Sequence, residues 1–319
     1  MVWWAFSNEM IEAEPHFTSD VLTPSTLDEC RPLWGDQGTC SHDVFEKTIG
    51  RVRWLLEQDR ARGRILRGPD QIARAFGVSA FITDEAADRL ATSSRPQLGR
   101  QLLEDSEWDR LVLTPAEVGR ANAGDGLQLL VVNQGYDTAI EDDATWAVLI
   151  GGLIQAFIDT HRGYRVRRVI IEQFGRRGAA FIAQSWPHVI CADVPTADSR
   201  GLRSARWSVT RDIAERQGGG LLPLFLYRRP TLGFSPAEKD VLSAALTCGT
   251  DAAIASALAL PVATVKSRWS RILRRIASTP LGSLLTPDRT TDRRGPQSRH
   301  LLLEHLRQNP WELTPYEPT

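Results

Sequence analysis

The sequence predicts an α+β protein in which a mixed α/β amino-terminal domain precedes an all-α carboxy-terminal domain. Residues 1–228 alternate strand-like runs with helical patterns, and residues 234–276 hold three successive helical patterns, each with its own start signal. A chain of 319 residues with 42% hydrophobic residues is long enough for two globular domains. We therefore divide it into a domain at 1–228, a helical domain at 229–279, and a linker, short helix and tail at 280–319.

Two helices are predicted in the amino-terminal domain. Residues 43–62 carry apolar side chains at helical spacing, and residues 143–162 form a second, more apolar pattern. The longest apolar run, 146–158, is too short to span a bilayer and is interrupted by Gln155. We therefore predict a buried helix there and no membrane segment.

The strand-like runs of this domain are rich in leucine or β-branched residues and are bounded by Gly, Asp, Asn or Pro. This pattern favours a sheet with helices packed on one face, an architecture common in sensory domains. The runs are 111–113, 127–132, 165–171, 179–183, 189–192 and 221–226.

The first carboxy-terminal helix begins with a capping box. The Ser235 hydroxyl can accept a hydrogen bond from the backbone N–H of Glu238, whose side chain can accept one from the N–H of Ser235. Pro236 presets the first helical φ angle. Gly249 ends the helix, because glycine adopts the left-handed conformation at little steric cost.

Two further helices follow at short spacing. Thr250 is the expected N-cap of the second helix. The third begins after Pro261 and carries Val265, Trp269 and Ile272 on one apolar face. Its opposite face is polar and basic.

Positive charge is concentrated toward the carboxy-terminal end. Between residues 261 and 310, ten Lys or Arg residues stand against three acidic residues, whereas the whole chain has a net charge of −1. A protein that neutralises phosphates gains affinity from counterion release, so this excess favours a nucleic-acid partner.

The segment 234–276 resembles the carboxy-terminal helix-turn-helix of the LuxR/GerE family of bacterial transcription regulators. The matching features are the run SPAEKDVL from Ser235, the pair Ile254-Ala255, the run TVK from Thr264, and the run SRI from Ser270. The resemblance implies a homodimeric regulator that binds double-stranded DNA, with a sensor domain for an unknown small-molecule effector or partner. The residues expected to contact DNA, with Arg268 as the main base-reading candidate, are Thr250, Thr264, Lys266, Ser267, Arg268, Ser270, Arg271 and Arg274.

Two alternatives stay open at this point. The run TVKSR from Thr264 also resembles the last region of extracytoplasmic-function sigma factors, which suggests a promoter-binding protein. The chain can also be an enzyme or interaction module that carries a DNA-targeting appendage. Against an enzyme, His161 and His188 have no serine, cysteine or carboxylate at a diagnostic spacing. We therefore predict no enzymatic activity, no catalytic residue and no cofactor.

The cysteines indicate neither a disulfide framework nor a metal site. The four residues Cys30, Cys40, Cys191 and Cys248 show no C-x-x-C spacing, and so few thiols in a chain of this length favour a reducing compartment. The first residues also lack the basic and apolar regions of a signal peptide. A cytoplasmic protein without a bound metal is the expectation.

Overall fold

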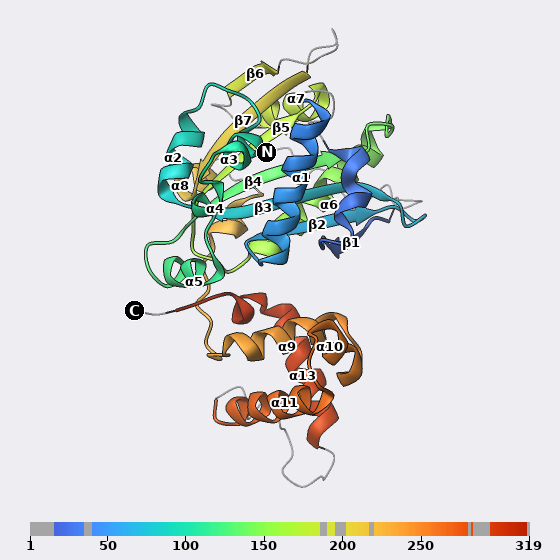
Figure 1. Ribbon diagram of the computed structural model, residues 1–319, viewed down its shortest axis with the longest axis vertical. Helices are drawn as coiled ribbons and strands as arrows, with labels where there is room; N and C mark the ends of the chain where they lie inside the picture. The colour runs from blue at the N-terminus through green and yellow to red at the C-terminus, as the bar shows by residue number, and fades with distance from the viewer. Residues whose placement is uncertain are drawn as a thin grey trace. The chain divides into compact units, whose positions relative to one another are not determined.

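A seven-stranded mixed sheet organises the first of two compact units in the computed structural model (Figure 1). The structure describes residues 16–34, 40–185, 190–194, 202–216, 220–279, 282 and 294–317. The first unit extends to Leu226, and the second spans Tyr227–Glu317.

The strands follow the order β1-β2-β3-β4-β5-β7-β6 across the sheet. Neighbouring strands are antiparallel except for β4 and β5, which are parallel. Their bounds are β1 Thr18–Val21, β2 Ala61–Arg67, β3 Ala73–Ile82, β4 Leu127–Tyr136, β5 Val166–Phe174, β6 Ile190–Val194 and β7 Leu202–Thr210.

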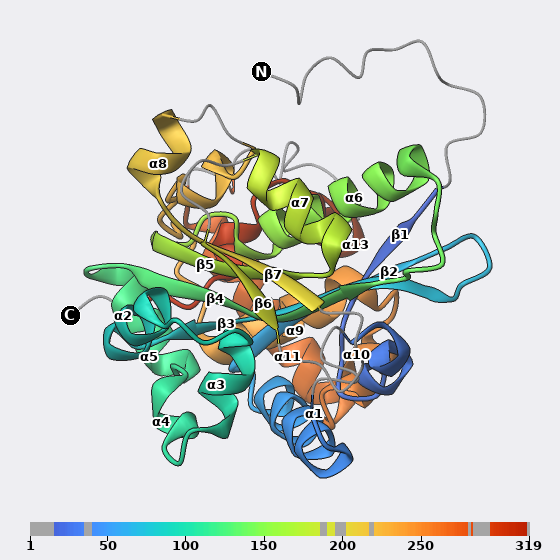
Figure 2. The same cartoon turned by 90° about the horizontal axis from the view of Figure 1, so that it is seen from above.

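Helices cover both faces of this sheet. Figure 2 shows α6 and α7 on one side and α1, α3 and α4 on the other. The predicted arrangement with helices on one face is therefore wrong. The helical elements of this unit are η1 Leu27–Leu33, α1 His42–Glu57, α2 Asp84–Thr92, α3 Leu98–Glu104, α4 Trp108–Leu111, α5 Pro115–Ala123, α6 Asp143–His161, α7 Arg176–Ser185, α8 Arg211–Arg216 and η2 Leu222–Phe225.

Side-chain alternation along β3 explains why both faces are covered. Phe76, Val78 and Ala80 are buried in the cluster that includes α1 and α3, and the intervening Gly77 and Ser79 face α6. Successive residues of a strand point to opposite faces, so a strand with apolar or small residues on both sides needs cover on both.

The predicted elements of the first unit are confirmed only in part. The helical patterns at 43–62 and 143–162 correspond to α1 and α6, and the runs at 127–132 and 165–171 fall on β4 and β5. The run at 189–192 falls largely on β6, although residue 189 lies outside the described residues.

Three predicted strands are wrong. The run at 179–183 lies in α7, the run at 221–226 contains η2, and only Val112 of 111–113 forms a bridge, to Ile82. Short apolar runs of this length fit a buried helix as well as a strand, so periodicity alone does not separate the two.

The parallel ladder between β4 and β5 ends early. Its last pair is Leu130 with Ile170, although β4 continues to Tyr136 and β5 to Phe174. A β-bulge stands at the same level, because Val132 of β4 is an extra residue between two consecutive pairs with β3. A bulge bends its strand, which accounts for the divergence of β4 from β5 beyond Leu130. We call this region, β4 residues 131–136 and β5 residues 171–174, the split.

The described part of the second unit contains helical elements and no β-strand. The capping box of Ser235 with Glu238 is confirmed, and the Thr250 side chain accepts a hydrogen bond from the N–H of Ala253 as predicted. Pro261 is the N-cap of the third helix and makes no side-chain cap. The elements are α9 Pro236–Thr247, α10 Asp251–Ala257, α11 Val262–Ala277, α13 Arg294–Gln308 and η3 Pro310–Leu313.

The carboxy-terminal segment completes the core of this second unit. Leu302 and Leu306 of α13 are fully buried against Val241, Trp269 and Ile272. The described residues of this unit therefore share one hydrophobic core, and α13 supplies part of it.

Glu312 joins the two ends of this unit. Its buried carboxylate accepts hydrogen bonds from the N–H of Thr231 at 2.8 Å, the hydroxyl of Thr231 at 2.8 Å and the N–H of Leu232 at 2.9 Å. We expect Glu312→Ala to lower the free energy of unfolding of the unit by about 3 kcal/mol, because the change leaves the buried N–H of Leu232 unpaired and removes both hydrogen bonds from Thr231. Urea unfolding of the full chain, followed by hydrogen exchange in α9 and α13, measures the loss.

Glu304→Ala is the matched control. Glu304 is half exposed, and its ion pair with Arg307 lies within one turn of α13, so its loss should cost at most about 0.5 kcal/mol. Equal stability of the two variants would contradict the anchoring role of Glu312.

Candidate functional site

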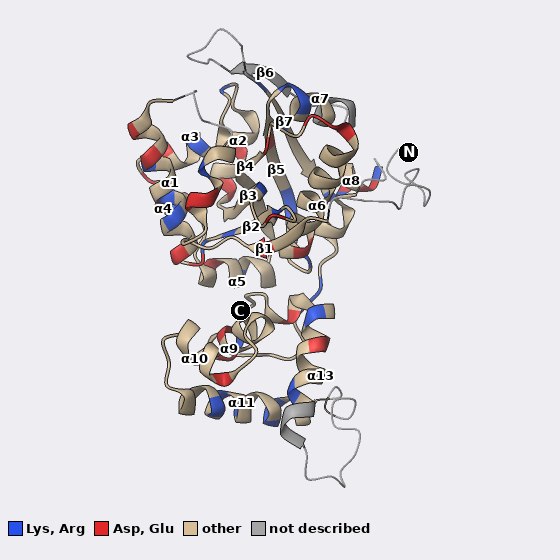
Figure 3. Ribbon diagram, turned by 90° about the vertical axis from the view of Figure 1, so that its right-hand side faces the viewer, with Lys and Arg blue, Asp and Glu red and all other residues tan. Residues whose placement is uncertain are grey.

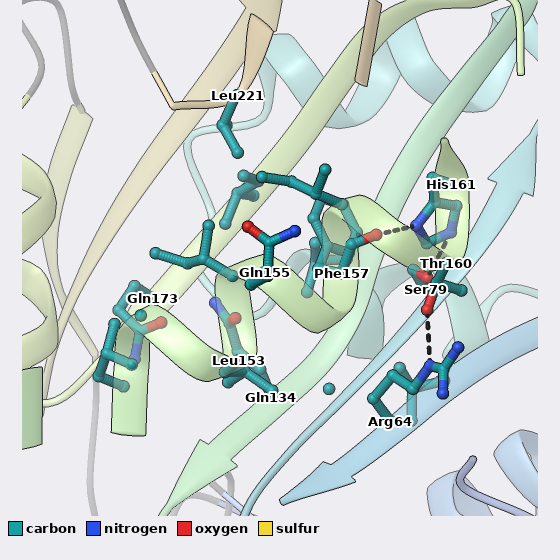
Figure 4. Close-up of a pocket in the computed structure, with 18 of the residues that line it drawn as sticks. Arg64, Ser79, Gln134, Leu153, Gln155, Phe157, Thr160, His161, Gln173 and Leu221 are labelled. Atoms are coloured by element: carbon teal, nitrogen blue, oxygen red, sulfur yellow. Dashed lines mark hydrogen bonds between the residues drawn. The ribbon is translucent and has the colours of Figure 1, made fainter. Parts of the chain in front are cut away.

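A cavity of about 230 Å³ lies between α6 and the sheet (Figure 4). Its walls come from β2, β3, β4 and β5 on one side and from α6 on the other, with α7 and Leu221 closing part of the rim. A liquid water molecule occupies about 30 Å³, so the space holds the equivalent of roughly seven or eight waters. This is enough for a small molecule or a medium-length acyl chain.

The wall formed by α6 is apolar and includes two small positions. Leu153, Ile154 and Phe157 line the cavity. Gly151 lies among them, and a Cβ atom added there would meet nothing within 4 Å. Opposite, a Cβ on Gly77 would meet only Leu153 Cδ1, at 3.7 Å. The two glycines therefore keep the cavity open where side chains would fill it.

Polar residues gather at the end of the cavity near the carboxy terminus of α6, which we call the cationic end: Arg62, Arg64, Ser79, Thr160 and His161. Arg64 Nε donates to Thr160 Oγ1 at 2.8 Å, and Ser79 Oγ lies 3.0 Å from His161 Nε2 (Figure 4). Both contacts join strands to the last turn of α6.

The protonation state of His161 follows from its partners. Its Nδ1 lies 2.8 Å from the carbonyl oxygen of Phe157, which can only accept, so Nδ1 carries the proton and Ser79 donates to Nε2. The pKa of His161 is lowered to about 3, and burial is the main cause. The hydrogen bond to the Phe157 carbonyl raises the pKa, and the charges of Arg62 and Arg64 lower it. The imidazole is therefore neutral at pH 7.

The contact between Ser79 and His161 escaped the sequence analysis, which found no serine at a diagnostic spacing from His161. The two residues are 82 positions apart in the chain. Only the pairing of β3 with its neighbours and the packing of α6 bring them together. Ser79 and His161 are 3% and 1% exposed, so this pair is a neutral, hydrogen-bonded part of the cavity wall.

Acid should destabilise the protein through His161. A histidine with a normal pKa of 6.5 when unfolded and about 3 when folded gives stability that is complete above pH 6.5 and is lost as the pH falls toward 3. The loss is on the order of 4 kcal/mol. We expect His161→Gln to flatten this part of the stability curve, measured by urea unfolding between pH 3 and pH 7. An unchanged slope would contradict the neutral buried imidazole.

The opposite end of the cavity meets the split. Gln134 of β4 and Gln173 of β5 line it there, and Gln134 Nε2 donates to the backbone carbonyl of Glu172 at 3.1 Å. Since Ile171 and Gln173 face the cavity, the Glu172 side chain points to the other face of the sheet.

Glu172 is a buried carboxyl group with a free oxygen. Its Oε2 accepts from the N–H of Leu98 at 2.6 Å, and its Oε1 has no hydrogen-bond partner in the described part of the chain. Burial raises the pKa of Glu172, although the N–H groups of Leu98 and Gln97, the Ser204 hydroxyl and the charge of Arg206 lower it. The group can therefore exchange a proton closer to neutral pH than an exposed glutamate.

The residues predicted to contact DNA do not line this cavity and belong to the second unit. Thr250 caps α10, and the others belong to α11, along which the Lys and Arg positions are coloured blue in Figure 3. Arg268 is half-buried and donates from Nη1 to the carbonyl of Ala237 at 3.1 Å, so its guanidinium is engaged with α9. The exposed members are Lys266, Ser267, Ser270, Arg271 and Arg274, and Thr264 is half-buried.

Other expectations can be placed on the described residues. Cys30, Cys40 and Cys248 are not joined in disulfide bonds, and burial raises the pKa of Cys30 to about 12. The Cys191 side chain and His188 lie outside what the structure describes.

Within the described residues, no cluster of three or more His, Cys, Asp or Glu side chains is arranged to hold a metal ion. No described helix has both the length and the apolar character needed to span a bilayer.

Comparison with known proteins gives structural matches alone. No protein-family model matches the chain, and no curated protein matches it. An agmatine N-acetyltransferase variant matches with a TM-score of 0.36 and 8% identity, over 60% of this chain and 99% of its own. A putative phosphinothricin N-acetyltransferase matches with a TM-score of 0.31 and 10% identity, over 61% and 98%. An N-acyl amino acid synthase from uncultured soil microbes matches with a TM-score of 0.32 and 11% identity, over 62% and 94%.

These findings correct the interpretation of the chain as a LuxR/GerE-type transcription regulator. The matched structures are acyl-transferring enzymes, not regulators that bind double-stranded DNA, and no family match identifies a helix-turn-helix of that type. The predictions of a sensor-like fold with a DNA-binding helical domain, of a DNA partner and of no enzymatic activity are therefore wrong. At these TM-scores the likeness assigns no activity or substrate to this chain, so its function has to be argued from its own geometry.

Proposed function

We propose that this protein is an acyltransferase that takes an acyl group from a thioester donor. The acyl chain would occupy the cavity beneath α6, and an amide-bearing arm of the donor would lie in the split between β4 and β5. The observation that carries the proposal is that the only parallel ladder of the described sheet opens, beyond Leu130 and Ile170, next to an apolar cavity.

The split offers backbone groups to an extended ligand. Beyond Leu130 and Ile170 the two strands no longer form a ladder with each other, so the N–H and C=O groups on their facing edges can bond to an amide-bearing chain as an added strand would. The side-chain amide of Gln134 already makes one such contact, with the carbonyl of Glu172. A pantetheine arm has two amide groups in an extended chain, which suits this edge.

The cavity offers burial to the acyl chain. Its lining around Ile150, Leu153 and Phe157 is apolar, and burying each methylene group is worth about 0.8 kcal/mol. A chain of several methylenes therefore gains binding free energy that an acetyl group does not. The donor should be a medium-chain acyl thioester.

Glu172 is the proposed general base. It lies on β5 within the split, on the face opposite the cavity, and its Oε1 is free to accept a proton. An amine acceptor approaching from the α3 side would attack the thioester carbonyl. The new C–N bond forms, the C–S bond breaks with the thiolate leaving, and the amine proton passes to Glu172. A raised pKa suits a base that works near neutral pH.

Thiol release from S-acyl coenzyme A donors of two to twelve carbons, in the presence of a set of primary amines and amino acids, tests the proposal. We expect consumption of donor with an optimum at medium chain length, and an N-acylated product detected by mass spectrometry. Absence of product with every donor and amine would contradict the proposed activity, even where a donor binds.

A further inference from the structure

Two arginines of β2 stand side by side at the cationic end of the cavity. Arg62 and Arg64 are two residues apart, so their side chains share the face of the sheet that α6 covers. Across the ladder they pair with Ser79 and Gly77 of β3. Both are half-buried and both line the cavity.

Neither guanidinium has a carboxylate partner among the described residues. Arg62 lies over the rings of Phe81 and Tyr164, at 5.7 and 5.4 Å from their centroids, and Arg64 donates to Thr160. By contrast Arg67, farther along the same strand, forms ion pairs with acidic side chains on β1 and η1, at 3.1 and 2.6 Å. Burial lowers the pKa of Arg64, against the weaker opposite influence of the charges of Asp159 and Asp20. Two half-buried positive charges without a carboxylate partner are stabilised when an anion joins them.

The space beside Arg64 is continuous with the apolar cavity. Its cross-strand neighbour Gly77 has no side chain, and a Cβ there would have only Leu153 Cδ1 as a neighbour, at 3.7 Å. The hydroxyl protons nearby are already used, since Thr160 donates to the carbonyl of Ala156 and Ser79 to His161. The donors left for a ligand are guanidinium N–H groups, whose fork geometry matches the two oxygens of a carboxylate.

We infer that the acyl group bound beneath α6 ends in a carboxylate, which Arg62 and Arg64 hold on the β2 side of the cavity, two strands away from the split. The substrate class is then the half-thioester of a medium-chain dicarboxylic acid. The orientation, with the thioester at the split and the carboxylate at the cationic end, rests on the proposed function. The carboxylate site itself rests on the two arginines, Gly77 and the apolar lining.

A binding measurement separates this inference from catalysis. Calorimetric titration of the full chain with octanoate and with uncharged octanamide compares two ligands of equal length. We expect octanoate to bind roughly 10- to 100-fold more tightly, as a charge-assisted pair provides. In the Arg62→Leu/Arg64→Leu double variant this preference should vanish, whereas Arg89→Leu, which removes an exposed arginine paired with Asp105, should keep it.

A kinetic comparison then tests the substrate class. Suberyl thioester, which carries a terminal carboxylate, should be used roughly 10- to 100-fold more efficiently than octanoyl thioester, and the double variant should lose this preference. Equal binding of octanoate and octanamide would overturn the inference whatever the enzyme activity. Arginine-dependent octanoate binding without any transfer would retain the carboxylate site and overturn the proposed acyltransferase. Transfer from octanoyl donors without a preference for suberyl donors would retain the proposed acyltransferase and overturn the inference of a dicarboxylic acyl group.

Discussion

The substitution Gly151→Leu is expected to lower kcat/KM for eight-carbon acyl donors by roughly 100-fold and to leave kcat/KM for acetyl donors nearly unchanged. Gly151 lines the cavity in the middle of α6, and the space above it is empty to 4 Å. A leucine side chain there would occupy the volume of about four methylenes of the acyl chain. At about 0.8 kcal/mol for each methylene, the lost burial corresponds to about 3 kcal/mol, or roughly two orders of magnitude.

The fold should tolerate this substitution. Replacing glycine by leucine inside a helix improves helix propensity by several tenths of a kcal/mol, and no atom lies close enough to clash with the new Cβ. Gly50→Leu is the matched control, because Gly50 also lies within a helix, α1, with open space around its Cβ, yet it is exposed and remote from the cavity lining. Unchanged use of eight-carbon donors by the Gly151→Leu protein would show that the acyl chain binds elsewhere.

Removing the proposed base should have the second large effect. We expect Glu172→Gln to lower kcat by a factor of about 10² to 10⁴ with little change in donor binding. The amide oxygen of glutamine can still accept from the N–H of Leu98, so the local packing is retained. Wild-type kcat should rise with pH as Glu172 ionises and then level off, and this ascending limb should be absent from the variant.

Stability measurements give this prediction a second readout. Because the pKa of Glu172 is raised in the folded protein, its contribution to stability is complete below the normal value of 4.5 and is lost as the pH rises through the folded pKa. Glutamine does not ionise, so the Glu172→Gln protein does not lose stability as the pH rises. It should therefore be at least as stable as the wild type at neutral pH. Glu104→Gln, at an exposed position of α3, is the control for both measurements. Full activity of the Glu172→Gln protein would exclude Glu172 as the base.

The local features of the sequence predicted local structure well. The capping box at Ser235 and the cap at Thr250 depend on residues three positions apart, and both are present in the structure. The apolar run of α6 is long enough to be distinctive. These features describe how an element begins, ends and buries one face.

The site depends on contacts that no local pattern contains. The extra residue Val132, which opens the split, is the last residue of the apolar run 129–132 and therefore leaves no break within it. The contact of Ser79 with His161 and the position of Gly77 opposite Arg64 require the register of β2 with β3 and the packing of α6. Such long-range pairings are set by the tertiary fold.

The functional error came from treating capped helices and a basic face as evidence for a partner. Helix caps and clustered arginines occur in many folds, because they satisfy helix ends and remain solvated. Arg268, the residue chosen as the main base-reading candidate, donates from Nη1 to the carbonyl of Ala237 within the same unit, and its role in base reading stays a prediction. The larger amino-terminal unit, whose sheet the sequence described incompletely, contains the site on which the proposed function rests.

Photo-crosslinking with an S-acyl coenzyme A that carries a diazirine in the middle of an eight-carbon chain tests the central claim most directly. Peptide mass spectrometry should place the label on α6 around Leu153 and Phe157, and excess unlabelled octanoyl coenzyme A should remove it. The Gly151→Leu protein should show the label reduced in parallel with its activity. Label confined to other parts of the chain, or label on α6 that unlabelled donor does not displace, would contradict an acyl chain bound beneath α6.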